Sequence, residues 1–235
     1  MNRPTFLLAV PLLALPSLAS ADFYSHRYAG LSFGNADQQG FCDSVDAQIS
    51  RFDTDSQDVA ERGCEGAEQL VKLYGGWRWT PSLAVEASVQ QLDDNKIGFT
   101  LTNARGEFLR VEDEIETRLA TAYAVGHLPL FDGASVFAKA GGGFWMGQLS
   151  ERQRGEVLVP IEQDGEIQEV PVEIRGRARE ADSGFHWSYG AGISYRNENN
   201  WTIRAEWETF QDIGSDDLRG TYDLETVSLG WSLHF

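Results

Sequence analysis

The sequence predicts an all-β fold: an eight-stranded antiparallel transmembrane β-barrel arranged as an up-and-down meander. The main observation is the strict alternation of residues 222–235, whose apolar parity consists of Val227, Leu229, Trp231, Leu233 and Phe235. Such alternation is typical of a β-strand with one apolar and one polar face. Short turns also alternate with long polar connections, a rhythm typical of membrane barrels. A soluble sandwich that ends on an apolar strand is the alternative interpretation.

Eight segments have the alternation expected of strands that cross a membrane. They are residues 23–34, 69–80, 83–92, 114–126, 134–148, 184–196, 201–210 and 222–235. No segment after the start of the chain approaches the ~18 continuous apolar residues of a membrane helix. In a soluble lipocalin-like barrel the apolar parity would face inward, around a ligand. Here the polar parity carries a few charges among Gly, Ser and Ala, which suits a narrow polar interior.

Four longer connections are expected on one side of the barrel. They are residues 35–68, 93–113, 149–183 and 211–221. The first is polar and lacks periodicity, so it is expected to be a long loop. The second and third contain turn signals, at 103–106 and at Asp164-Gly165, and each is expected to form a hairpin beyond the membrane. Gly141–Gly143 is compatible with a bulge in the fifth strand.

The first 21 residues have the features of a secretory signal peptide. Arg3 lies near the start, an apolar run extends from Phe6 to Leu15, and Ala19-Ser20-Ala21 has the small residues of a cleavage site. We therefore expect residues 1–21 to be a signal peptide and residues 22–235 to be the barrel. Export of such a barrel indicates the bacterial outer membrane.

The chain is acidic, with a formal net charge of −17 at pH 7. Nucleic-acid binding requires a basic surface, so this class of function is excluded. Most of the acidic residues lie in the four long connections. We therefore expect acidic extracellular loops, which would bind an extracellular partner that the sequence does not identify.

The polar parity of the strands carries charges that we expect to face the lumen. These residues are Lys72, Arg78, Glu86, Arg118, Lys139, Arg204, Glu206 and Glu208. An unpaired charge in so narrow a space costs several kcal/mol of desolvation, so an ion-pair network is expected. Glu86 and Glu206 are its expected central acids, and Lys139 and Arg204 its central bases. Alternatively, the charges lie near the two mouths of the barrel and are hydrated.

Cys42 and Cys64 are the two cysteines of the chain. A disulfide is expected in an exported protein, with two free thiols or half of a metal site as alternatives. Asp53, Asp55 and Asp58 have part of the spacing of a calcium loop, but the glycine and final glutamate of an EF-hand are missing. No metal and no cofactor are therefore expected.

Several short motifs, taken together in order and spacing, resemble the OmpA-like eight-stranded outer-membrane β-barrel family. They are Tyr28-Ala-Gly-Leu-Ser-Phe-Gly34, Leu73-Tyr-Gly-Gly-Trp77, Leu83-Ala-Val-Glu-Ala87, Phe137-Ala-Lys-Ala-Gly141, Tyr189-Gly-Ala-Gly-Ile193, Arg204-Ala-Glu206 and Leu233-His-Phe235. The resemblance implies a small closed barrel in the outer membrane and no particular activity. It also implies contact with outer-membrane lipid and lipopolysaccharide, and with the barrel-assembly machinery through the C-terminal strand. The peptidoglycan-binding domain of larger members is not expected.

Three functions are compatible with such a barrel. The first is a non-enzymatic surface protein, structural or partner-binding through its loops. The second is a lipid A-modifying enzyme, because His186-Trp187-Ser188 is similar to the His-x-Ser pair of lipid A deacylases. Strand parity directs His186 and Ser188 inward, however, away from a lipid substrate. The third is a small pore, although eight strands leave an interior that side chains nearly fill.

Overall fold

The computed structural model describes residues 26–131, 133–163 and 166–235, and the predicted signal peptide lies outside these residues. Ten strands in the described part of the chain form one sheet. The elements in chain order are β1 (His26–Gln39), α1 (Phe41–Ile49), the 3₁₀ helix η1 (Ser50–Phe52), β2 (Gln57–Glu65), β3 (Gln69–Arg78), β4 (Leu83–Leu92), β5 (Asn95–Asn103), β6 (Phe108–Phe131), β7 (Ala134–Gln163), β8 (Glu166–Arg196), β9 (Trp201–Ser215), the 3₁₀ helix η2 (Asp216–Leu218) and β10 (Gly220–His234).

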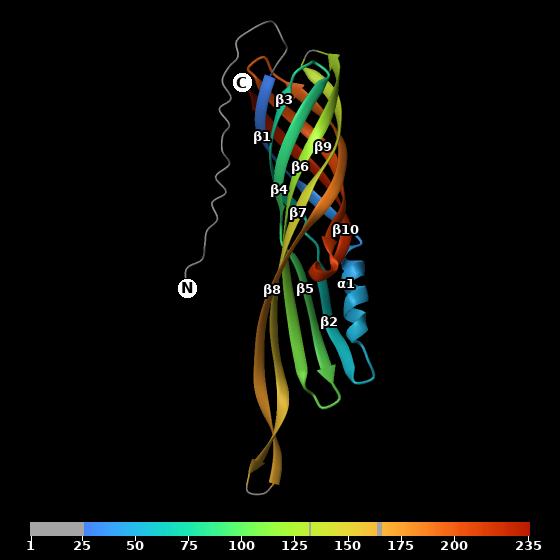
Figure 1. The fold of residues 1–235 in the computed structure, drawn as a ribbon, viewed down its shortest axis with the longest axis vertical. Helices are drawn as coiled ribbons and strands as arrows, with labels where there is room; N and C mark the ends of the chain where they lie inside the picture. The colour runs from blue at the N-terminus through green and yellow to red at the C-terminus, as the bar shows by residue number, and fades with distance from the viewer. Residues whose placement is uncertain (1–25, 132, 164–165) are drawn as a thin grey trace.

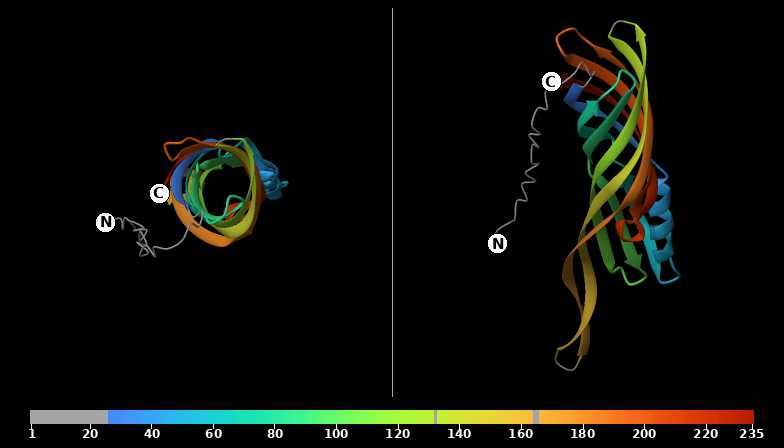
Figure 2. Two further views of the ribbon diagram at one scale, coloured as in Figure 1. Left: turned by 90° about the horizontal axis from the view of Figure 1, so that it is seen from above. Right: turned by 45° about the horizontal axis from the view of Figure 1, so that its top comes forward.

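Eight of these strands close into a barrel, which is seen end-on in the left view of Figure 2. Their order around the ring is β1, β3, β4, β6, β7, β8, β9 and β10. The first strand pairs with the last, with Tyr28 opposite His234, and the pairing of β6 with β7 completes the ring. Ring neighbours follow chain order and run antiparallel, which confirms the predicted eight-stranded meander.

The two ends of the barrel differ in length (Figure 1). One end carries the short turns and the C-terminus, and the other extends into a tall curved sheet. The longest hairpin joins β7 to β8, with paired residues from Ala134 and Tyr195 out to Gln163 and Glu166. β5 also runs along β6 beyond the end of β4. Both predicted hairpins are therefore present, although the turn at residues 164–165 lies outside the described residues.

Strand boundaries agree with the sequence prediction best where the turns are short. β4 spans the predicted residues 83–92, whereas β6, β7 and β8 are much longer than predicted. Their extra length comes from the long connections, which continue the ladder instead of leaving the sheet. The bulge that we considered at Gly141–Gly143 is not observed, because the register runs through these residues without a shift.

The first long connection is not the irregular loop that the sequence suggested. It contains α1, η1 and β2, and β2 pairs with β5. The helix begins after Gly40, which has a positive φ of 76°. Phe41, Val45 and Ile49, spaced four residues apart, form its buried face. This helical period is short and surrounded by polar residues, so a search for strand alternation misses it.

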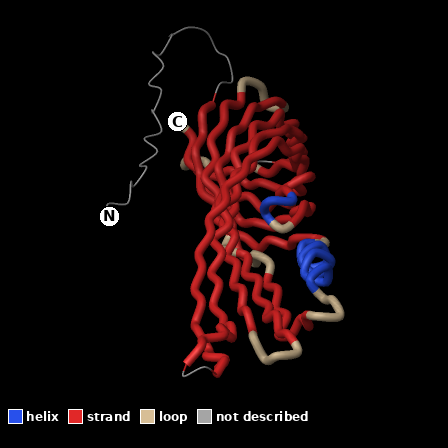
Figure 3. The backbone as a smooth tube through the Cα atoms, turned by 60° about the horizontal axis from the view of Figure 1, so that its bottom comes forward, coloured by secondary structure: helices blue, strands red, loops and turns tan. Residues whose placement is uncertain are grey.

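The expected disulfide is present between Cys42 of α1 and Cys64 of β2, with the two Cα atoms 5.7 Å apart. It ties the helix to the outermost strand of the sheet. Because α1 also packs against β10, the helix forms part of the wall at the extended end of the molecule (Figure 3). None of the helices in residues 26–131, 133–163 and 166–235 is long and apolar enough to span a membrane.

The outward face of the ring is apolar and the inward face is polar. On β10 and at Phe235, which follows it, the predicted membrane-facing residues are exposed, from 47% for Leu233 to 75% for Phe235. Leu73 of β3 and Ile193 of β8 are likewise exposed, whereas Lys72 and His186 are fully buried. The predicted parity of β6 is wrong, because Leu119, Thr121 and Tyr123 face the interior and Arg118 faces outward. The exposed apolar residues of the ring, such as Leu73, Ile193 and Leu229, form an apolar belt around the barrel. Arg118 lies beside Met146 of β7, at the edge of this belt toward the extended end.

The interior of the molecule has two parts with different chemistry. Inside the apolar belt the buried residues are mostly polar or charged, including Lys72, Glu86 and Glu206. Toward the extended end they form an apolar core, built from α1, the ends of β9 and β10, and the extension of β5, β6 and β7. Its fully or nearly fully buried members include Phe41, Val45, Leu119, Trp145, Phe210, Ile213 and Leu224.

Candidate functional site

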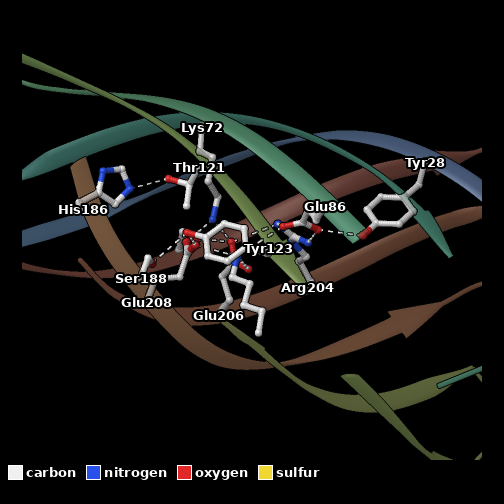
Figure 4. A network of polar contacts seen from close by, with 12 residues as sticks. Tyr28, Lys72, Glu86, Thr121, Tyr123, His186, Ser188, Arg204, Glu206 and Glu208 are labelled. Carbon is white, nitrogen blue, oxygen red and sulfur yellow. Dashed lines mark hydrogen bonds and ion pairs between the residues drawn. The ribbon is translucent and has the colours of Figure 1, made fainter. Parts of the chain in front are cut away.

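A network of ion pairs fills the middle of the lumen (Figure 4). Glu206 of β9 is the residue with the most partners. It pairs with Lys72 of β3, with Lys139 of β7 at 3.0 Å between Nζ and Oε2, and with Arg204 at 3.2 Å between Nη2 and Oε1. The hydroxyl of Ser228 on β10 donates a further hydrogen bond to Glu206. One carboxylate therefore accepts bonds from four strands of the wall.

A second carboxylate, Glu86 of β4, lies next to Arg204. The guanidinium donates two bonds to it, from Nη1 to Oε2 at 2.6 Å and from Nη2 to Oε1 at 3.1 Å. This forked geometry is the strongest form of an arginine–carboxylate pair. The hydroxyl of Tyr28 on β1 also donates to Glu86, at 3.0 Å. The Cζ atom of Arg204 lies 3.4 Å from the ring centroid of Tyr74, which covers one face of the cation.

Glu208, one step further along β9, completes the network. It pairs with Lys72 and, at 2.7 Å, with Lys139, and it accepts a hydrogen bond of 2.9 Å from the hydroxyl of Tyr123. The same hydroxyl lies 3.0 Å from Ser188 Oγ on β8. The three carboxylates, Glu86, Glu206 and Glu208, thus face three cations, Lys72, Lys139 and Arg204. The formal charge of the cluster is zero, and none of the six side chains is more than 7% exposed.

Bonds of this network join all eight strands of the ring, since Tyr28, Lys72, Glu86, Tyr123, Lys139, Ser188, Glu206 and Ser228 each come from a different strand. Sequence reasoning did not assign the tyrosines to it. The sequence feature that could have identified them is a glycine at the position opposite each tyrosine on the neighbouring strand. Tyr28 is paired with Gly76 and Tyr74 with Gly30, and a Cβ atom at either glycine would come within 2.6 Å of the tyrosine ring. Glycine provides the space into which each ring leans.

Two of the eight charges expected in the lumen lie elsewhere. Arg118 is on the outer surface, 51% exposed in its side chain, and pairs with Glu116. The outward parity of β6 changes from alanine to charged residues where the strand leaves the apolar belt, which explains the wrong assignment. Arg78 lies at the end of β3 near the short-turn mouth, where its guanidinium donates to the Pro81 carbonyl. The alternative interpretation, in which the charges lie near the mouths of the barrel, therefore applies to the position of Arg78 but not to the six buried charges.

His186 and Ser188 both point inward and are buried. His186 Nε2 lies 2.9 Å from Thr121 Oγ1, and Ser188 bonds to Tyr123. Among the described residues, no hydrogen bond joins the histidine to the serine. The side chain between them, Trp187, is 60% exposed on the outer face. The pair is thus separated from the lipid phase by the barrel wall, and its members are hydrogen-bonded to other groups.

The two sides of the network have different surroundings. Toward the short-turn mouth a cavity of about 50 Å³ lies between Tyr28, Glu86, His127, Phe137 and Arg204. This is room for a few water molecules at most. Toward the extended end, the apolar core around Leu119, Trp145 and Phe210 occupies the lumen. Nothing in residues 26–131, 133–163 and 166–235 forms a group of three or more potential metal ligands.

A smaller polar cluster lies beyond the apolar belt. Arg219, which follows η2, donates from Nε to Asp113 Oδ2 on β6 at 2.8 Å, and pairs with Glu151 on β7. Burial raises the pKa of Asp113 above its ordinary value, and the nearby guanidinium opposes this shift without cancelling it. The cluster fastens the 216–219 segment to the tall sheet.

Several solved structures are similar to this chain. Among solved structures, Ail, the attachment invasion locus protein of Yersinia pestis, is 16% identical, with 90% of this chain and 97% of Ail covered and a TM-score of 0.41. Neisserial surface protein A is 10% identical, with 90% and 97% covered and a TM-score of 0.40. For the N-terminal β-barrel domain of Pseudomonas aeruginosa OprF the identity is 13%, the coverages are 89% and 97%, and the TM-score is 0.38.

No curated protein matches the chain by sequence. Residues 5–235, in contrast, match the family described as "Outer membrane protein beta-barrel domain". Because this match spans nearly the whole chain and the strands close into the barrel that the family requires, the protein belongs to this family of bacterial outer-membrane β-barrels.

Proposed function

We propose that the protein is a closed, non-enzymatic scaffold of the outer membrane, which acts through its extracellular half. The observation that carries this proposal is the filled lumen. A neutral network of six buried charges spans the barrel, and an apolar core follows it toward the extended end. Solutes would have to break several buried ion pairs to pass, at a cost of several kcal/mol for each charge left unpaired.

The absence of catalysis is part of the same proposal. A lipid A-modifying enzyme needs its nucleophile within reach of lipid, and Ser188 is only 2% exposed and faces the lumen. His186 Nε2 is engaged with Thr121 and, in the described part of the chain, no hydrogen bond joins His186 to Ser188, so the histidine is not placed as the base for this serine. The small pore and the lipid A-modifying enzyme are therefore the less favoured functions.

The partners follow from the surface that the barrel presents. The apolar belt, which includes Leu73, Ile193 and Leu229, is suited to outer-membrane lipid, and its edge toward the extended end would meet lipopolysaccharide. The C-terminal strand, with Trp231 and Phe235 exposed, is the proposed contact for the barrel-assembly machinery. The extended sheet and α1 lie at the end away from the short turns, toward the bottom of Figure 1, and an extracellular partner would bind there.

Conductance in a planar lipid bilayer tests the closed lumen. The purified, folded protein is expected to give no large stable channels. Glu206→Ala, which removes the carboxylate between Lys72 and Lys139, is expected to add small and brief openings. Large stable channels from the unchanged protein would contradict the proposal and favour a pore.

Activity on lipid is tested separately. Incubation of the folded protein with lipopolysaccharide, followed by mass analysis of lipid A, is expected to leave the acyl chains intact. If the wild type removes an acyl chain from lipid A and the His186→Ala variant does not, the non-enzymatic assignment is contradicted. Retention of the folded form of this variant on an unboiled gel is the control for its structure.

A further inference from the structure

The outward face of the β7–β8 hairpin has three bands of different charge along its length. The first, level with the apolar belt, includes Phe144, Met146, Phe185 and Trp187, which are 47–63% exposed. The second is basic. We call it the arginine band, and it consists of Arg152, Arg154, Arg175, Arg177 and Arg179. The third, toward the tip, is acidic and includes Glu156, Glu162, Glu169 and Glu173. Strand parity places all three bands on the same face.

The arginines of the band lie opposite one another. In the ladder, Arg152 is paired with Arg177, and Arg154 with Arg175. On the β6 side, Arg110 is the neighbour of Arg154, and Glu112, which pairs with Arg110 at 3.3 Å, is the neighbour of Arg152. Like charges directly opposite on adjacent strands repel and destabilise a sheet. A chain with a net charge of −17 has acidic residues available for these positions, yet carries arginine at each of them. This arrangement is expected where the strands meet an external anion.

The arginines are also largely free of internal partners. Arg175 pairs with Glu173 at 2.9 Å, and both side chains are at least 70% exposed, so the pair is weak. In the described part of the chain, Arg152, Arg154, Arg177 and Arg179 form no ion pair or side-chain hydrogen bond. Their guanidinium groups therefore have their donors available. Arginine donors match phosphate and carboxylate oxygens in a forked geometry.

The position of the band identifies the source of the anion. It continues the lipid-facing side of the barrel, and Ser150, the partner of Arg179, is only four residues beyond Met146. Four residues of a strand rise about 13 Å, less once the strand is tilted, which is the height of a lipid headgroup above the acyl chains. A lipid that packs against Phe144 and Met146 would thus hold its headgroup against the arginine band.

We propose that the arginine band binds the phosphorylated, anionic saccharide headgroup of lipopolysaccharide in the outer leaflet. This inference deepens the proposed function, because it gives the lipopolysaccharide partner a site on the hairpin. A soluble polyanion is the less suitable ligand. It would approach from the aqueous side, past the acidic band and against the negative charge of the chain, whereas a lipid enters from the side within the membrane plane.

Binding to the folded, full-length protein in detergent tests the site. The ligands are lipopolysaccharide, the same lipopolysaccharide after chemical removal of its phosphates, and a soluble sulfated polysaccharide. The variant is the double substitution Arg152→Gln and Arg177→Gln. The matched control is Arg51→Gln with Arg105→Gln, which removes two exposed arginines from η1 and from the 104–107 turn.

Affinity for intact lipopolysaccharide is expected to fall about tenfold in the double variant, since each lost charge-assisted hydrogen bond weakens binding. It should fall similarly for the wild type when the phosphates are removed or the salt concentration is raised. The control variant should bind like the wild type. Equal binding by the double variant and the wild type, or tighter binding of the soluble polysaccharide than of lipopolysaccharide, would overturn the proposal.

Hydrogen exchange of the hairpin amides separates binding from a structural role. Without lipopolysaccharide, the hairpin amides of the double variant should exchange no faster than those of the wild type, because a repulsive cross-strand pair is removed. Added lipopolysaccharide should increase protection in the wild type and not in the variant. A loss of protection in the unliganded variant would mean that the arginines stabilise the hairpin itself. Bilayer conductance does not depend on this site, so failure of the scaffold proposal is detected independently.

Discussion

The lumen inside the apolar belt and the interior of the extended half beyond it, which we propose to be the extracellular half, are built on the same strands with opposite chemistry. On β7 the inward residues change from Lys139 and glycines to Trp145 and Leu149, while the outward residues change from Phe144 and Met146 to Arg152 and Arg154. The surroundings explain the reversal. Lipid requires an apolar exterior and leaves polar groups for the interior, whereas water requires the opposite.

This reversal has a consequence for energetics. In the membrane half, cohesion across the lumen depends on directional ion pairs such as Arg204 with Glu86, which fail when one partner is missing. In the extracellular half it depends on contacts such as Phe41 with the ring of Tyr222, which weaken gradually as atoms are removed. Each half can therefore be disturbed by a substitution that should leave the other half intact.

The largest effect is expected for Glu206→Ala. After this change the three buried cations, which include Lys72 and Lys139, face only two carboxylates, so one buried positive charge is uncompensated. The predicted loss is roughly 3–5 kcal/mol of unfolding free energy. Urea unfolding in lipid vesicles measures it. Glu173→Ala, which removes an exposed partner of Arg175, is the matched control and should unfold like the wild type. Equal midpoints for the two variants would mean that the network is not needed for stability.

The extracellular half should respond most to Phe41→Ala. Phe41 is 1% exposed and lies against Tyr222. Removal of a buried phenyl ring costs about 3 kcal/mol or more, but here the loss should be local. Amides of α1 and β2 are expected to exchange faster, while the barrel keeps its unboiled mobility on a gel. The control is Phe52→Ala, because Phe52 is 45% exposed. Collapse of the whole barrel in Phe41→Ala would show that the halves are not separable.

Loss of the disulfide should have a smaller and equally local effect. The Cys42–Cys64 bond closes a segment with a sequence separation of 22 residues. A chain-entropy estimate for such a loop is about 3 kcal/mol, and we expect less, because the buried face of α1 restrains the helix independently. Protease digestion of the double substitution Cys42→Ser and Cys64→Ser should cut the 40–66 segment sooner. Unchanged digestion would mean that the apolar core alone orders this segment.

The same contrast explains which features the sequence could predict. β10 and β4 lie within the belt along most of their length, so one alternation describes them and their boundaries were predicted well. β6 crosses the membrane surface, and its inward residues change from Tyr123 and Thr121 to Leu119 and Ile115. An interpretation that assumes one polarity for the whole strand must then assign Arg118 to the wrong face.

The site was predictable in composition but not in its pairing. Charges on the polar parity identified Glu86, Lys139, Arg204 and Glu206, whose side chains meet in the structure. The pairing of Glu208 with Lys72 depends on the stagger between β9 and β3, which are not neighbours in the ring. The stagger between these two strands cannot be predicted from local sequence. The tyrosines were missed because their role depends on a glycine in another strand.

The smallest effect concerns Asp113, whose carboxyl lies in the extracellular half and beyond the belt. Burial raises its pKa in the folded protein, although Arg219 opposes the shift. The folded state therefore binds this proton more readily than the unfolded state, and stability should fall as pH rises from the unfolded pKa through the raised folded one. The Asp113→Asn variant removes this titration. We expect its unfolding free energy to match or exceed that of the wild type at neutral pH by less than about 1 kcal/mol, and this advantage should disappear in acid. Hydrogen exchange of the 108–118 amides at pH 7.5 and 4.5, compared between the variant and the wild type, measures the difference. A variant that is markedly less stable at neutral pH would mean that the ion pair with Arg219 outweighs the cost of burying the carboxylate.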